Sequence, residues 1–181
     1  MTEGPIFPMN NFDHIWTTVI KECGVENRHL GFHGIDHWRR VERNGLILSH
    51  EPGVDLEVVR LFAVFHDCQR LNDGWDPQHG ARGAEFASSL RGRLFELEDH
   101  RFALLEHACI WHTQGGRNDD PTIGACWDAD RLDLGRVGII PSAEFMSTDL
   151  AADIADHGSI DPWLPLAEAF GETESKADEG A

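Results

Sequence analysis

Residues 55–68 read Asp-Leu-Glu-Val-Val-Arg-Leu-Phe-Ala-Val-Phe-His-Asp-Cys, and the rest of the chain can be interpreted outward from this stretch. Its first residue is a suitable N-cap for a helix that runs to the end of the stretch. Val59, Phe62 and His66 follow the spacing i, i+3, i+7 and share one apolar face. Asp67 follows directly, and a buried carboxylate is costly unless it is paired or bound to a metal. The alternative is a buried histidine beside an aspartate that faces solvent, so the pair needs support from other segments.

Glycine and proline divide the remaining chain into further segments of helix length. Asp76-Pro77 predicts a helix start, with Asp as the N-cap and Pro at the first helical position. No stretch alternates with period two between hairpin turns, and no internal repeat is present. The sequence therefore predicts an all-α protein, with one compact helical domain over residues 1–170 and an acidic, disordered tail over 171–181. The predicted helices, besides 55–68, cover about 10–23, 34–49, 76–91, 98–113 and 121–134, with shorter pieces after Ser142, Asp149 and Pro162.

Composition narrows the class of protein. The chain has 181 residues, of which 41% are hydrophobic, enough for a single sizeable core. Its net charge of -17 repels phosphate backbones, so no nucleic-acid partner is expected. No window approaches the roughly 18 apolar residues of a membrane span, and the N-terminus does not resemble a signal peptide. A cytoplasmic location is predicted, the four cysteines are expected to be buried thiols, and the oligomeric state is left open.

A second carboxylate lies on an apolar stripe. Ile123, Trp127 and Asp130 follow the spacing i, i+4, i+7, which places Asp130 on the inward face of its helix. Asp128 lies about 200° away around a regular helix, so both carboxylates cannot face one site. Asp128 is therefore expected to pack against a loop or to support the site without facing it.

Three more histidines lie on the apolar stripes of their helices: His37, His79 and His112. His107 lies about 140° from His112 and is interpreted as a packed or partly exposed side chain, and His33 as a cap or surface residue. Four or five helices thus each direct one histidine or aspartate inward, a costly pattern unless something binds there. Nitrogen and carboxylate ligands suit Mn, Fe, Co, Ni or Zn, and permit Mg if waters complete the shell.

The order His37-x-x-Arg40-Val41, His66-Asp67 and Ala129-Asp130-Arg131-Leu132, spread over roughly residues 30 to 140, resembles the HD-domain superfamily of metal-dependent phosphohydrolases. The resemblance implies that one metal is bound by His37, His66, Asp67 and Asp130. The segment from Arg70 to Gly80 looks like that of an uncharacterised bacterial subgroup. Several branches place extra histidines at positions like His79 and His112, which implies a second metal or a contact to the substrate phosphate. The chain lacks the GYP signature of the cyclic-dinucleotide branch and the acidic residues of (p)ppGpp hydrolases, so those substrates are not expected.

The resemblance predicts hydrolysis of a small phosphate ester, with nucleotides among the candidates, using one or two divalent ions (Mn, Fe, Ni, Co, Mg or Zn). Asp67, His79 and His112 are the predicted catalytic groups. Arg70, Arg82 and Arg131 are candidates to neutralise the substrate phosphate, each with a surface salt bridge as the alternative. Two other functions remain open: a di-iron oxygenase that cleaves a small molecule, and a non-catalytic regulator that binds a metal or nucleotide.

Overall fold

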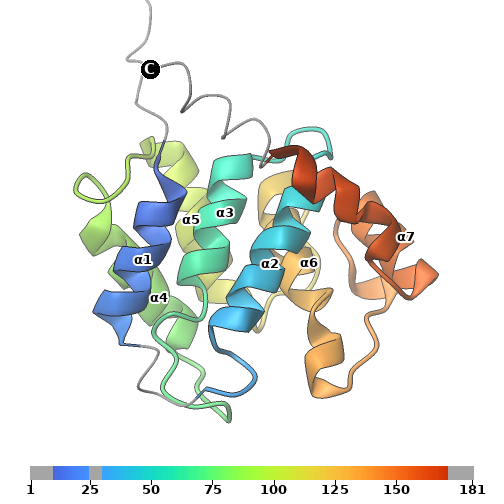
Figure 1. Ribbon diagram of the computed structural model, residues 1–181, viewed down its shortest axis with the longest axis horizontal. Coiled ribbons are helices and arrows are strands. Elements are labelled where there is room, and N and C mark those ends of the chain that lie inside the picture. The colour runs from blue at the N-terminus through green and yellow to red at the C-terminus, as the bar shows by residue number, and fades with distance from the viewer. Residues whose placement is uncertain (1–9, 25–29, 171–181) are drawn as a thin grey trace, which may run out of the picture.

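The computed structural model describes residues 10–24 and 30–170, and this part of the chain forms helices and no β-strand. The all-α prediction is therefore confirmed (Figure 1). The α-helices include α1 (Phe12–Cys23), α2 (Ile35–Leu48), α3 (Leu56–Phe65), α4 (His79–Leu90), α5 (Asp99–Trp111), α6 (Pro121–Arg131) and α7 (Asp149–His157), and residues 164–170 are also α-helical. Short 3-10 helices follow at η2 (Leu134–Val137), η3 (Ala143–Phe145) and η4 (Asp161–Trp163).

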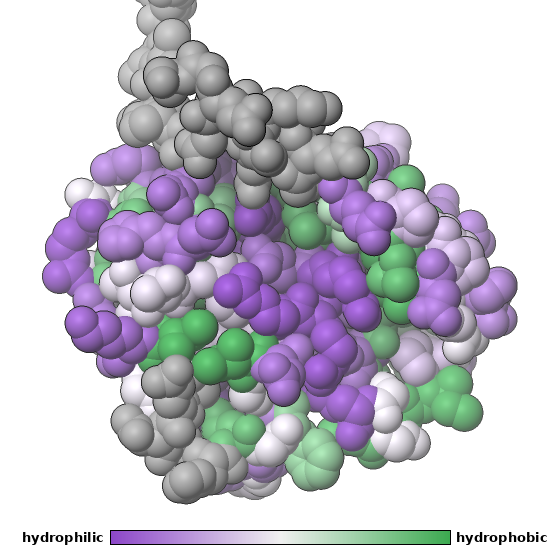
Figure 2. All heavy atoms as spheres, in the orientation of Figure 1, coloured by the Kyte–Doolittle hydropathy of each residue, from purple (hydrophilic) through white to green (hydrophobic). Residues whose placement is uncertain are grey.

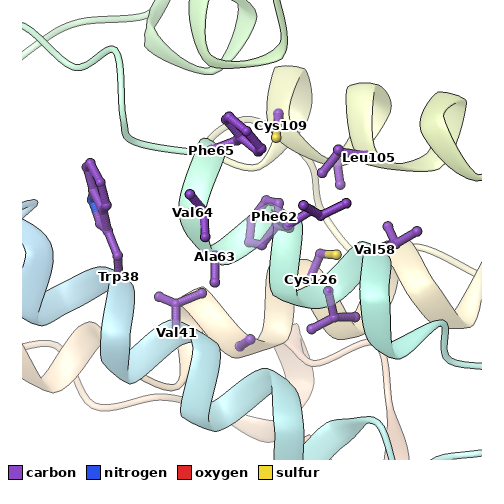
Figure 3. Packing of buried hydrophobic residues seen from close by; sticks show 14 of the residues in the cluster. Trp38, Val41, Val58, Phe62, Ala63, Val64, Phe65, Leu105, Cys109 and Cys126 are labelled. Carbon is purple, nitrogen blue, oxygen red and sulfur yellow. The ribbon is translucent and has the colours of Figure 1, made fainter. Parts of the chain in front are cut away.

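Helix α3 lies at the centre of the fold, in contact with α1, α2, α4, α5 and α6. It is apolar almost all round, and seven of its ten residues are buried, because it has a neighbour on nearly every side. Figure 3 shows its side chains between those of the surrounding helices. The labelled neighbours are Trp38 and Val41 from α2, Leu105 and Cys109 from α5, and Cys126 from α6. This core fixes the position of the residues that directly follow α3.

Close packing of the helices depends on glycines that face a neighbour. A Cβ atom at Gly45 of α2 would lie 2.3 Å from Cγ1 of Val59. In α4, a Cβ at Gly83 would lie 2.3 Å from the Phe65 carbonyl oxygen, and one at Gly80 would lie 2.1 Å from the carbonyl oxygen of Cys109. A side chain at Gly45 would push α2 away from α3, and side chains at Gly80 and Gly83 would push α4 away from α5 and α3. The absence of side chains therefore sets how closely the first turn of α4 approaches the centre.

Three predicted helix boundaries were wrong, and one of them has a tertiary reason. Helix α6 ends at Arg131 rather than at about Leu134. Helix α4 begins at His79 with Gln78 as its N-cap, not at Asp76-Pro77. The Asp76 carboxylate instead accepts hydrogen bonds from the backbone N–H of Leu71 at 2.9 Å and from Arg82 at 2.6 Å. Helix α3 ends at Phe65 rather than at 68, so His66 and Asp67 lie just beyond its last turn. By contrast, Asp55 caps α3 as predicted.

The chain ends and the cysteines complete the comparison with prediction. The proposed tail 171–181 lies outside the described residues. Cys23, Cys68, Cys109 and Cys126 are buried, as expected. Among the described helices, none combines the length and hydrophobicity needed to cross a membrane.

Candidate metal centre

The ends of five helices bring the predicted polar residues together. His37 lies in the first turn of α2, and His79 is the first residue of α4. His66 and His112 directly follow α3 and α5, and Asp130 lies in the last turn of α6. In Figure 1 the N-terminal end of α2 and the C-terminal ends of α3 and α6 lie toward the lower edge of the molecule. Chain topology therefore gathers side chains that are far apart in sequence.

One group of ligands is formed by His37, His66 and Asp67, all of them buried. The Nε2 atoms of the two histidines are 3.2 Å apart. Asp67 Oδ2 lies 3.7 Å from each of these nitrogens. Asp130 Oδ1 joins the group at 3.3 Å from His37 Nε2.

A second group is formed by Asp67, His79 and His112, which are also buried. The Nε2 atoms of these two histidines are 2.9 Å apart. Asp67 Oδ1 lies 3.1 Å from His79 Nε2 and 3.6 Å from His112 Nε2. The two oxygens of Asp67 thus face different groups, so this carboxylate could bridge two ions.

The orientation of the four imidazoles follows from their Nδ1 partners, each of which is an acceptor. The Nδ1–H of His37 donates to Asp133 Oδ2 at 2.7 Å. That of His66 donates to the carbonyl oxygens of Phe62 and Ala63, each at 3.2 Å. The Nδ1–H of His112 donates to the Cys109 carbonyl oxygen at 2.7 Å, and that of His79 donates to the Asp76 carbonyl oxygen. With the proton on Nδ1, every Nε2 carries a lone pair directed into the site. Histidines that bind metals characteristically donate the other ring N–H in this way.

These donors fit a divalent metal ion. Facing lone pairs about 3 Å apart repel each other unless a cation lies between them. Two nitrogens each about 2.1 Å from one ion, at about 90°, would themselves be about 3 Å apart. In addition, the buried Oδ1 atoms of Asp67 and Asp130 have no hydrogen-bond partner. A buried carboxylate oxygen without a partner is costly, and a cation would satisfy both. The residues could therefore hold one or two metal ions.

The electrostatics of the centre also favour a cation. Burial lowers the pKa of His66 to about 3, so its imidazole is neutral and able to act as a ligand at pH 7. Burial alone would raise the pKa of Asp67, but the neighbouring histidines hold it well below its ordinary range. The C-terminal ends of α3, α5 and α6 contribute partial negative charge, whereas the N-terminal ends of α2 and α4 contribute partial positive charge, so the attraction for a cation comes from the carboxylates.

Asp133 supports the centre and was missed in the sequence analysis. Its carboxylate accepts from His37 Nδ1 at 2.7 Å and from Arg40 Nε at 2.6 Å. Burial alone would lower the pKa of His37, but the carboxylates of Asp130 and Asp133 beside its two ring nitrogens raise it. The signal was present in the sequence, because Asp133 follows Asp130 by three residues, or about one helical turn.

The three candidate arginines are placed differently from one another. Arg70 lies at the centre, with Nη1 3.1 Å from His79 Nε2 and 3.6 Å from Asp67 Oδ1. Arg82 binds Asp76 and the Gln69 carbonyl oxygen, which holds the loop before α4.

Arg131 does not lie with the metal ligands. Its guanidinium donates to the carbonyl oxygens of Gly115 at 2.7 Å and Phe145 at 3.2 Å. It thus joins the loop after α5 to the segment after α6. The hydrogen bonds of Arg131 and Arg82 therefore indicate that these side chains hold loops in place. They give no support to the predicted role of the two arginines in binding the substrate phosphate.

Asp128 faces away from the ligands, as the helical spacing predicted. Its carboxylate accepts hydrogen bonds from the backbone N–H groups of Ser147 and Thr148 at 2.8 Å each, and from the Thr148 hydroxyl at 3.0 Å. The Asp128 carboxylate therefore fixes the segment before α7, and it does not orient any of the proposed metal ligands. His107 is exposed and stacks on Trp127, in agreement with its interpretation as a packing residue.

The fold and the site define a helical protein with a buried histidine–aspartate centre that could hold a metal ion. A solved structure with the same architecture is a predicted HD superfamily hydrolase from an uncultured Thermotogales bacterium. The two are 23% identical, the match covers 92% of each chain, and the TM-score is 0.61. This likeness confirms the HD-type fold that the sequence motifs predicted. No protein-family model matches the chain, and no curated protein matches it.

Proposed function

We propose that the protein is a metal-dependent hydrolase that cleaves a small phosphate ester. The observation that carries this proposal is the orientation of four buried imidazoles, each bound through Nδ1 to an outer acceptor, around two carboxylate oxygens without partners. The description of the structural relative as a predicted HD superfamily hydrolase supports the same class of reaction.

The ligands proposed for the first ion are His37, His66, Asp67 and Asp130, and those for a second ion are Asp67, His79 and His112. Bound ions would polarise a phosphoryl oxygen and lower the pKa of a water molecule. Hydrolysis would join the oxygen of a water molecule to phosphorus as the ester P–O bond breaks, and the proton given up by the water would leave on the alcohol.

The residues of the chain position these reactants. Asp67 stays ionised because its pKa is held well below the ordinary range, so it can accept a hydrogen bond from the attacking water and orient it. Arg70 lies against Asp67 and His79, where its guanidinium can offset charge on the phosphoryl group. Asp133 keeps the His37 imidazole in a fixed tautomer.

A panel of phosphate esters, assayed for release of inorganic phosphate with Mn, Fe, Ni, Co, Mg or Zn, tests the proposal. We expect metal-dependent release from at least one ester, and loss of release in Asp67→Asn. Asp153→Asn is the matched control, because it removes the same charge from an exposed position on α7. If no ester is hydrolysed while the iron-loaded protein consumes oxygen with a substrate, the proposal is wrong and the di-iron alternative is favoured. Metal binding with neither activity would favour a regulator.

A further inference from the structure

Large exposed hydrophobic side chains gather on three segments of the described chain. The first segment precedes α2, the second follows the His66-Asp67 pair, and the third begins at η2, after α6. Together they carry most of the large hydrophobic residues that are exposed in the described chain, and we call this set the apolar rim. Its members are Phe32, Leu71, Trp75, Val137, Ile139 and Ile140. Trp75 is 85% exposed and Ile140 is 84% exposed. Figure 2 shows hydrophobic surface toward the lower edge of this face, below a hydrophilic band.

Hydrogen bonds join the three segments. The Asp73 carboxylate, from the second segment, accepts from the backbone N–H of Gly31 at 2.7 Å and of Phe32 at 3.3 Å. It also accepts from His33 Nδ1 at 2.8 Å. Arg136, from the third segment, donates Nε–H to the Phe32 carbonyl oxygen at 2.9 Å. The rim is therefore held in place by the fold, which lowers the entropic cost of binding a ligand there.

Two arginines connect the rim to the candidate metal centre. Arg70 donates to the carbonyl oxygens of Asn72 and Gly74 at 3.0 Å each, next to Trp75. The same guanidinium lies 3.6 Å from Asp67.

On the other side, Arg136 Nη2 lies 3.8 Å from Asp130 Oδ1, while its Nε–H binds the backbone of Phe32. Each guanidinium thus contacts a carboxylate of the centre and the backbone of a rim segment. From the centre outward, the order is metal ligands, then cations, then apolar side chains.

We propose that the ester cleaved at this site is a phosphate monoester of an aromatic, apolar alcohol. This rests on the proposed function. The phosphoryl group would lie at the metal ligands beside Arg70 and Arg136, and the ring would cover Trp75 and Leu71. A flat ring gains from burial against an indole and an aliphatic side chain. A sugar or polyphosphate at the same position would leave this surface uncovered in a strongly acidic protein.

Equilibrium binding of phenylphosphonate and methylphosphonate to the manganese-loaded protein tests the proposal by calorimetry. The two ligands share a headgroup that the enzyme cannot hydrolyse and differ in the ring. We expect phenylphosphonate to bind about tenfold more tightly. The double variant Leu71→Ala/Trp75→Ala should bring the ratio of the two affinities close to one, with methylphosphonate affinity unchanged. Phe145→Ala, at an exposed position outside the rim, is the matched control and should keep the ratio.

The other outcomes separate this inference from the proposed function. Methylphosphonate binding without a gain from the ring, or a ratio that survives the double variant, would overturn the assignment of the rim and leave the phosphohydrolase proposal intact. Failure of both phosphonates to bind would contradict the proposed function, and this inference with it. A dimer in light scattering that the double variant abolishes, with the affinity ratio unchanged, would assign the rim to a second copy of the chain and overturn the proposal.

Discussion

Replacing Asp133 with alanine should weaken metal binding although Asp133 is not itself a proposed ligand. Its carboxylate accepts the Nδ1–H of His37 at 2.7 Å and fixes the imidazole so that Nε2 faces His66 and Asp130. Arg40 contributes a second contact to the same carboxylate at 2.6 Å. The variant keeps every proposed ligand and removes only the partner that orients one of them.

The size of the effect follows from these contacts. Loss of an outer hydrogen-bond partner of a ligating histidine lowers metal affinity by about 10- to 100-fold. The same change leaves the buried His37 Nδ1–H without an acceptor, which costs about 1–3 kcal/mol of folding stability. In a chain of this size each kcal/mol corresponds to about 2–4 °C in Tm. Asp133→Asn should show a smaller effect, because its amide oxygen can still accept the hydrogen bond.

Competition with a fluorescent chelator measures the affinity, and thermal unfolding of the metal-free protein measures the stability. Asp153→Asn serves as the control, since it removes a negative charge from an exposed position on α7. If Asp133→Ala bound metal as tightly as the original protein, His37 would not depend on its Nδ1 partner. The reasoning about tautomer and orientation would then be refuted.

Three further changes test the packing and the charges. Gly45→Ala should lower the free energy of unfolding by about 1–3 kcal/mol in urea titrations, because the new methyl group overlaps Val59. Val59→Ala also destabilises, because this side chain is buried, but Gly45→Ala/Val59→Ala should lose less than the sum of the two single variants; a loss equal to that sum would refute the overlap. Asp128→Ala should lower Tm, since the Asp128 carboxylate holds the segment before α7, and it should leave the metal affinity nearly unchanged. A large loss of metal affinity would show that the assignment of Asp128 to the outward face of α6 is wrong. Burial alone would raise the pKa of Asp55, but Arg101 and the N-terminal N–H groups of α3 lower it. This carboxylate therefore stabilises the fold above its unfolded pKa of about 3.9, and the stabilisation is lost as the pH falls through its lower folded pKa. Asp55→Asn should therefore be destabilising at pH 7, and its difference from the original protein should shrink in acid; a difference independent of pH would contradict this.

Periodicity predicted the residues that lie within regular helices. It chose Asp130 over Asp128 because α6 stays regular through Arg131, so the rotation per residue could be counted reliably. It also directed His37 inward, because the stripe on α2 is continuous. Asp133 follows Asp130 by about one turn, but it lies beyond the end of α6, so this spacing alone could not direct its side chain to His37.

Tertiary partners explain what the sequence could not predict. Asp76 looked like a helix N-cap, yet its carboxylate is bound by Arg82 and Leu71, and α4 starts three residues later. The arginines were the least predictable residues, because a long flexible side chain can reach acceptors on several segments. Arg136, which contacts the centre, gave no signal in the sequence, whereas Arg131, within a recognised motif, binds loop carbonyl oxygens instead.

The most direct test of the central claim is the metal content of the protein purified without chelators, measured by inductively coupled plasma mass spectrometry. We predict at least one divalent ion per chain, and two if Asp67 bridges both groups of ligands. His66→Ala should lose that ion, whereas Asp153→Asn should keep it. A protein that contains no metal, and takes up none when offered Mn, Fe or Ni, would contradict the assignment of the His66-Asp67 centre.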